Sequence, residues 1–150
     1  MHGPEHHVLD GAALLTAFFN AGGQIELKPC LEELVQRGLA MPGAICGKWG
    51  VCGAVKSMGA ALSVIDKTGP LSVDDSWGKH MDFTSAALAE ISKTGGPICF
   101  KRDAFFSFQQ AVKYLNENYD VTIPERKPVC TFAGRNSQCI GDRCPFSKEN

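Results

Sequence analysis

A chain of 150 residues with 44% hydrophobic residues is long enough for one domain with a single core. Its formal charge of -1 gives no general attraction to nucleic acid or to acidic membrane surfaces, so neither is expected as a partner. The N-terminal region has histidines and acids where a secretory leader is basic, and its apolar run is too short to cross a bilayer. We therefore expect a cytoplasmic protein whose thiols stay reduced.

Five helices are predicted. The first is apolar on nearly every turn and stops at Gly22 and Gly23, as buried helices do. Ser72 and Asp75 resemble a capping box ahead of the fourth helix. The helices are expected at residues 6–20, 28–37, about 52–66, 80–93 and about 101–118.

The predicted fold class is all-α, with about five helices packed as one domain over residues 1–150. Residues 121–123 have the composition of a short strand, but one isolated strand does not make a sheet. Residues 127–150 form an irregular, cysteine-rich tail, which we interpret as metal-binding.

The tail contains Cys130, Cys139 and Cys144 in the spacing C-x8-C-x4-C, with glycine turns between them. Such turns bring thiolates together around one ion, whereas zinc and iron–sulfur clusters normally take four protein ligands. Cys99 is the candidate fourth ligand, because it precedes the last predicted helix, where the helix dipole favours a thiolate. The alternatives are a disulfide staple, which an odd count of seven cysteines makes less suitable, and free or buried thiols.

A second candidate site is the stretch CGKWGVCG, which contains Cys46 and Cys52. Cys52 falls at a predicted helix start and Lys48 adds a positive charge, so we expect a lowered thiol pKa there. The two cysteines are interpreted as a redox pair, as metal ligands, or as a nucleophile with its resolving thiol. The alternative is a packing loop with incidental cysteines.

The N-terminal stretch MHGPEHH contains His2, Glu5, His6 and His7. Imidazole and carboxylate groups suit zinc or iron ligation and proton transfer, and His6 is the candidate catalytic histidine if this stretch folds onto the Cys46–Cys52 loop. The alternative is a set of solvated terminal histidines. Two further residues are expected to be structural: Cys30 in the core and His80 as a surface or hydrogen-bonded helix residue.

Four motifs taken together, MHGPEHH, CGKWGVCGA, GGPICFKR and the C-x8-C-x4-CPF ending, resemble a cysteine-rich family of unknown function found mainly in anaerobic archaea and bacteria. Some relatives have a second cysteine where this chain has Phe100, so that position is not needed here as a ligand. The resemblance implies no established reaction. It implies an anaerobic setting, which favours thiolate or iron–sulfur chemistry over disulfides.

The leading hypothesis is a small metal- or iron–sulfur-binding protein that transfers electrons or sulfur to a protein partner. Its centre would lie at Cys99 and the tail cysteines, and Cys46 and Cys52, with His2 or His6, would form a reactive thiol site. Two alternatives are a structural-zinc module for interaction or regulation and a transferase with Cys52 as its nucleophile.

Overall fold

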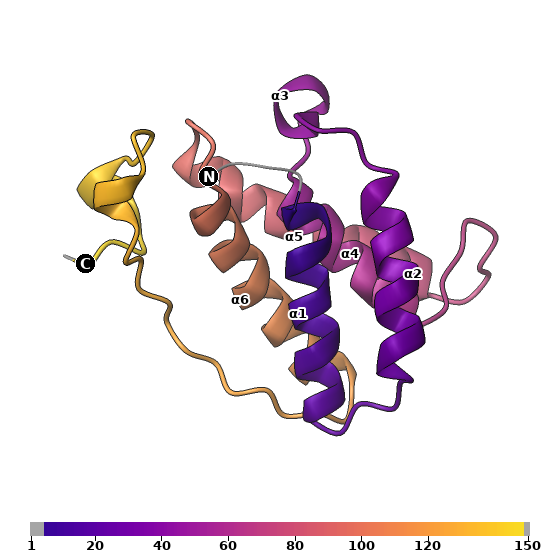
Figure 1. The fold of residues 1–150 in the computed structure, drawn as a ribbon. Helices are drawn as coiled ribbons and strands as arrows, with labels where there is room; N and C mark the ends of the chain where they lie inside the picture. The colour runs from indigo at the N-terminus through magenta and orange to yellow at the C-terminus, as the bar shows by residue number, and fades with distance from the viewer. Residues whose placement is uncertain (1–4, 149–150) are drawn as a thin grey trace.

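The computed structural model describes residues 5–148, which contain helices and 3-10 turns but no strand (Figure 1). The all-α prediction is confirmed, with five long helices as expected and one short helix that was not. The helices are α1 (His6–Asn20), α2 (Leu27–Leu39), α3 (Ile45–Trp49), α4 (Gly53–Ile65), α5 (Ser76–Thr94) and α6 (Phe100–Asn118). The 3-10 turns are η1 (Ala133–Arg135) and η2 (Gly141–Arg143).

Helix α4 is the centre of the fold, because it packs against α1, α2, α5 and α6. Small residues allow it to come close to α1: the Gly11 amide donates to Ser57 Oγ at 2.9 Å. A Cβ atom on Gly11 would lie 2.5 Å from the carbonyl oxygen of Ser57, so no larger residue fits without separating the two helices. The core around this contact is fully buried and consists mainly of Leu14, Leu15, Leu34, Met58, Ala61, Leu62, Ala111 and Leu115.

The boundaries of α1 are those predicted from its apolar pattern. Helix α5, in contrast, begins before its predicted start, because the Asp74 carboxylate accepts a hydrogen bond from the Ser76 amide at 2.9 Å. The predicted capping box is therefore wrong: Ser72 Oγ accepts instead from the Gly69 amide. Helix α3 lacked any sequence signal, and its flanking residues Ala44 and Gly50 both have left-handed backbone angles.

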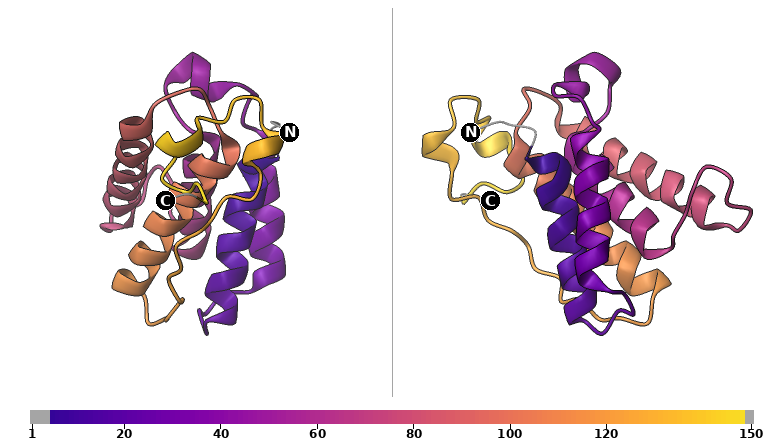
Figure 2. Two further views of the ribbon diagram at one scale, coloured as in Figure 1. Left: turned by 90° about the vertical axis from the view of Figure 1, so that its left-hand side faces the viewer. Right: turned by 45° about the vertical axis from the view of Figure 1, so that its right-hand side comes forward.

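The segment after α6 runs back beside that helix and carries the tail to the end where α6 begins (Figures 1 and 2). No strand occurs within residues 5–148, so residues 121–123, whose composition suits a short strand, do not form one. Instead the side-chain amide of Asn116 both donates to the Ile123 carbonyl, at 2.9 Å, and accepts from its amide, at 2.8 Å. Residues 124–128 then line a groove together with α6. The tail thus returns to α6 without secondary structure of its own.

Candidate functional site

The three tail cysteines and Cys99 line one cavity of about 420 Å³. Cys99 is the N-cap residue of α6, and the tail supplies Cys130, Cys139 and Cys144 from the turns around η1 and η2. The cavity therefore joins two parts of the chain that are far apart in sequence, as the spacing argument expected. All seven cysteines of the chain are free thiols in the structure, so a disulfide staple is not formed.

Each tail sulfur accepts a hydrogen bond from the backbone two residues further along. The Phe132 amide donates to Cys130 Sγ and the Gly141 amide donates to Cys139 Sγ, both at 3.4 Å. At Cys144 burial raises the thiol pKa, while a hydrogen bond from the Phe146 backbone lowers it. Backbone N–H groups stabilise a thiolate more than a neutral thiol, since an ionised sulfur is the stronger acceptor.

One aromatic side chain anchors the tail on α6. Phe146 is 3% exposed, and its ring lies 5.3 Å from that of Phe105 and 4.9 Å from that of Phe106, both in edge-to-face geometry. The Phe146 carbonyl accepts from the Cys130 amide at 2.7 Å, which ties the two ends of the tail together. At the other side of the cavity the side-chain amide of Asn136 donates to Cys99 Sγ at 3.5 Å.

The cavity wall also holds a buried cation, Arg102, which is 3% exposed. Its Nη2 donates to the carbonyl oxygens of Gly95 and Pro97 at 2.8 and 2.9 Å, and its Nε lies 3.3 Å from Asp103 Oδ1. Two further cations, Lys101 and Arg135, line the same cavity, whereas no carboxylate among the described residues does. The electrostatic character of the cavity therefore favours negatively charged sulfur.

The four thiols are not arranged as finished ligands. Within residues 5–148, no group of three or more His, Cys, Asp or Glu side chains is placed so that it could hold a metal ion. A centre bound by all four sulfurs therefore requires the tail to close further on α6. Only two three-residue 3-10 turns lie between Cys130 and the end of the described tail, so such a movement breaks no long element.

The second predicted site is buried rather than open. Cys52 is the N-cap residue of α4, as predicted, but only 6% of it is exposed. The expectation of a lowered pKa is wrong: burial raises the pKa of this thiol to about 11, against the opposing hydrogen bonds from the Val55 and Ala54 backbone. The nearby Asp103 carboxylate and the Cys46 thiol raise it further. Cys46, in α3, is half-buried.

The N-terminal histidines lie at the start of α1. His6 Nδ1 is 3.1 Å from both carboxylate oxygens of Asp10, and its ring lies 5.2 Å from the ring of Phe100, beside Cys99. His7 is buried against Gly53, where a Cβ atom would lie 2.5 Å from the imidazole Cδ2. These contacts bring the first turn of α1 next to the starts of α4 and α6. His2 lies outside the described residues.

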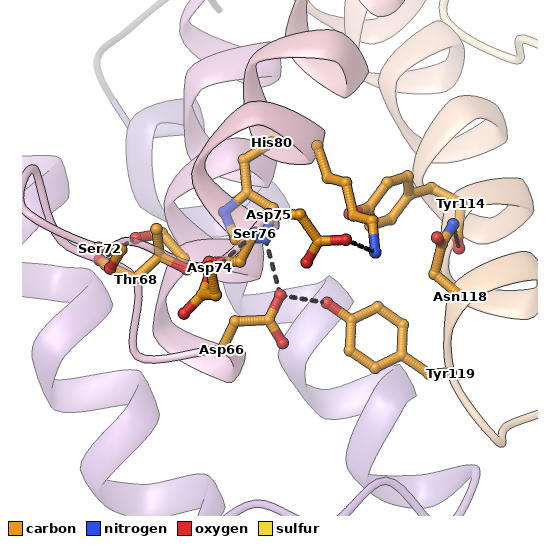
Figure 3. Close-up of polar contacts among 12 residues, drawn as sticks. Asp66, Thr68, Ser72, Asp74, Asp75, Ser76, His80, Tyr114, Asn118 and Tyr119 are labelled. Carbon is orange, nitrogen blue, oxygen red and sulfur yellow. Dashed lines mark hydrogen bonds and ion pairs between the residues drawn. The ribbon is translucent and has the colours of Figure 1, made fainter.

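A third polar cluster was not anticipated as a unit. His80 is buried in α5, and its Nε2 lies 2.8 Å from Oδ2 of Asp66 at the end of α4 (Figure 3). The Tyr119 hydroxyl, at the end of α6, donates to the same oxygen at 2.7 Å. Three helices thus meet at one carboxylate, which gives the cluster a structural role. The expectation of a hydrogen-bonded helix residue at His80 is confirmed. Cys30, expected in the core, is only partly buried and packs against it.

Comparison with known families gives a match over nearly the whole chain: the model of a family of unknown function, DUF5714, covers residues 1–147. The chain belongs to this family. No curated protein and no solved structure matches it. Membership in DUF5714 therefore agrees with the expected resemblance to a family of unknown function, and it assigns no reaction to the four-cysteine cavity.

In residues 5–148 of this DUF5714 member, every helix is too short or too polar to span a bilayer. The catalytic, metal and partner roles expected from the sequence stay predictions, because neither the family nor the geometry tests them. The structure adds one residue that interacts with both thiol sites, Asp103. It pairs with Arg102 in the cavity wall, and its negative charge contributes to the raised pKa of Cys52.

Proposed function

We propose that this DUF5714 member is a small protein that binds a thiolate-ligated metal centre, an iron–sulfur cluster in the first place, and passes electrons to a protein partner. The ligands in this proposal are Cys99, Cys130, Cys139 and Cys144. The observation that carries it is the common cavity of about 420 Å³ that these four cysteines line. Four cysteines are the usual ligand set of iron–sulfur clusters.

The hydrogen bonds to sulfur support an ionised ligand set. Cys130, Cys139 and Cys144 each accept from the backbone two residues ahead, which is geometry that stabilises a thiolate without any side chain. Only the thiolate form of cysteine binds metal. The tail backbone is therefore already arranged to favour the form that a metal centre needs.

The open cavity has space for a cluster as well as for a single ion. Tetrahedral zinc with Zn–S bonds of about 2.3 Å would draw the four sulfurs to within about 4 Å of one another and leave little space among them. The observed cavity has room for a larger centre, bounded by Phe105 and Phe132 as well as by the thiols. Apolar walls of this kind would limit the access of water to the centre.

Structural zinc is the second candidate, and the form of the tail favours it. Residues 119–148 contain no α-helix and no strand, and in the tail itself the ring of Phe146 packs on α6 against Phe105 and Phe106. A metal ion that ties the tail to Cys99 would contribute directly to its folding. In this case the protein is an interaction or regulatory module rather than an electron carrier.

The thiol pair is the second part of the proposal. Cys46 and Cys52 would act as a redox pair, and the Asp103 carboxylate, which pairs with the cavity-wall residue Arg102, also acts on the Cys52 thiol. A nucleophilic transferase is disfavoured, because a buried thiol with a pKa of about 11 is protonated at neutral pH. The setting that we propose is cytoplasmic, where thiols stay reduced.

The test is metal and sulfide analysis of protein purified without oxygen, together with its visible spectrum. Iron and sulfide in near-stoichiometric amounts, with colour that is lost in Cys139→Ser, would support the cluster. Cys30→Ser is the matched control, because Cys30 packs against the core and does not line the cavity. One zinc and no colour would support the second candidate, and protein without either metal would refute both.

A further inference from the structure

The guanidinium group of Arg102 is held in one orientation at the start of α6. Its Nη2 donates to the Gly95 and Pro97 carbonyl oxygens, and its Nε pairs with Asp103. Gly95 and Pro97 belong to the turn that precedes α6. The Arg102 side chain therefore cannot rotate away without breaking the two hydrogen bonds to these carbonyls and the contact with Asp103. Arginine holds such a planar fork more rigidly than lysine does.

The third nitrogen of the Arg102 guanidinium group, Nη1, takes no part in these contacts. Nη1 of Arg102 is buried, and among residues 5–148 it has no hydrogen-bond partner. A buried donor without a partner is unfavourable, so the site is incomplete as long as nothing accepts from it. The Arg102 side chain lines the four-cysteine cavity. It therefore brings a buried, unpartnered donor to the wall of the cavity that the four sulfurs line.

The other cations of the cavity wall are satisfied or exposed. Lys101 Nζ lies 5.0 Å above the centre of the Phe132 ring, and Arg135 is exposed to solvent. A charge that water screens has little effect on a buried centre, whereas a buried charge acts at nearly full strength. Arg102 is therefore the buried cation of this wall. Because Asp103 offsets part of its charge at Nε, what Arg102 offers a buried anion is chiefly the donor Nη1.

We propose that Arg102 is the internal counter-charge of the four-cysteine centre and that its Nη1 donates a hydrogen bond to an anionic sulfur of that centre. This inference rests on the proposed metal site. Four thiolates exceed the charge of one divalent ion, and also that of a cluster core with charge +2, by two negative charges. Such an excess is costly to bury without hydrogen bonds and positive groups nearby, and Arg102 supplies one donor and offsets part of the excess. Arg102 is a positioning residue in this scheme and not a ligand.

The experiment is titration of the full chain with Co²⁺ under anaerobic conditions at one fixed pH, because thiolate-to-cobalt absorption reports thiolate ligands whichever metal is native. The variants are Arg102→Gln, Arg102→Lys and the matched control Arg135→Gln, which removes the same charge from an exposed part of the same wall. We expect Arg102→Gln to bind Co²⁺ at least about ten-fold more weakly, Arg102→Lys to recover part of the loss, and Arg135→Gln to stay within about three-fold of the wild type.

A second readout separates this role from a merely structural one. At saturating Co²⁺ the thiolate-to-cobalt band of Arg102→Gln should move to longer wavelength, because a sulfur that loses a hydrogen bond and a nearby positive charge gives up electrons more easily. Arg135→Gln should leave the band in place. Wild-type affinity and an unshifted band in Arg102→Gln would overturn the inference while leaving the metal centre intact. Absence of thiolate-to-cobalt absorption in the wild-type protein would overturn the metal centre, and the counter-charge with it.

A separate comparison distinguishes loss of folding in Arg102→Gln from loss of metal affinity. Arg102→Gln leaves Asp103 buried without its cation, so the double variant Arg102→Gln/Asp103→Asn removes both charges together. Far-UV circular dichroism establishes which variants keep the helices, and Co²⁺ affinity is compared among those. The double variant should be at least about ten-fold weaker than Asp103→Asn alone. Equal affinities in this pair would overturn the inference.

Discussion

The imidazole Nε2 of His80 lies 2.8 Å from the carboxylate Oδ2 of Asp66 and connects α5 to the end of α4. Tyr119 adds α6 to the same carboxylate, so one side chain joins three helices (Figure 3). Burial alone would raise the pKa of Asp66, but the hydrogen bonds from His80 and Tyr119 outweigh it and the pKa is lowered. The charged carboxylate is thus stabilised by folding.

This lowered pKa predicts a pH dependence of stability. A carboxyl group whose pKa is lower in the folded state stabilises the fold above its unfolded pKa of about 3.9, and this contribution is lost as the pH falls through the lower, folded pKa. Asp66→Asn should lower the free energy of unfolding by about 1–2 kcal/mol at pH 7 and weaken its dependence on acid pH. Urea unfolding between about pH 7 and pH 2.5 measures both effects. Asp82→Asn, at an exposed position of α5, is the control, and equal behaviour of the two variants would contradict the prediction.

Gly11 predicts a steric effect at the contact between α1 and α4. Gly11→Ala should lower the free energy of unfolding by about 1–3 kcal/mol, because the new Cβ would lie 2.5 Å from the Ser57 backbone oxygen, which cannot move aside alone. Gly78 is the matched helical control, since a Cβ there meets nothing within 4 Å. Gly78→Ala should raise the free energy of unfolding by about 0.5–1 kcal/mol. Chemical denaturation of both variants checks the opposite signs, and a stabilising Gly11→Ala would contradict the close approach.

Phe146 predicts that docking of the tail depends on one aromatic anchor. Phe146→Ala should weaken docking on α6 by about 3 kcal/mol, since it removes the ring that packs against Phe105 and Phe106. Limited trypsin digestion should then cut faster after Arg126, while the helical circular dichroism stays the same. Phe132→Ala is the control, because that ring is 42% exposed. Equal cleavage rates for Phe146→Ala and the wild type would refute the anchor.

Burial of Cys52 predicts slow chemistry at its thiol. At pH 7.5 iodoacetamide should modify Cys52 at least about ten-fold more slowly than the exposed Cys139, because a thiol with a pKa of about 11 is almost entirely protonated there. The rate at Cys52 should still be rising at about pH 9.5. Peptide mass spectrometry of time points resolves each cysteine in one sample. Labelling of Cys52 as fast as that of Cys139 at pH 7.5 would restore the nucleophile hypothesis.

Local sequence patterns predicted the long helices better than the segments that connect them. The apolar run and the Gly22–Gly23 stop gave α1 its observed bounds, because both signals lie within the helix and its cap. Helix α3 has five residues between two left-handed positions and leaves no periodic pattern to detect. The early start of α5 depends on Asp74, which differs from the residues that a capping box would use.

At the candidate site, too, the features with a local sequence signal were predicted and those that depend on tertiary contacts were not. Cysteine spacing and the start of α6 were enough to place Cys99 in one group with the tail cysteines, which line its cavity in the structure. The role of Arg102 in that wall has no local signal, because its partners are backbone carbonyls fixed by the turn ahead of α6. The pKa of Cys52 was expected from its helix position alone, whereas burial in a cluster with Ala87 of α5, which no local motif reports, dominates it.

The central position of α4 has a consequence for synthesis on the ribosome. Helices α1 and α2 leave the exit tunnel first and can pack against each other, but much of their apolar surface is covered by α4, which follows later. A nascent chain that ends before residue 53 therefore exposes Leu14, Leu15 and Leu34 to solvent or to chaperones. The helical core can close only once α4 and the helices beyond it have emerged, and the cysteine tail is the last part to reach its place.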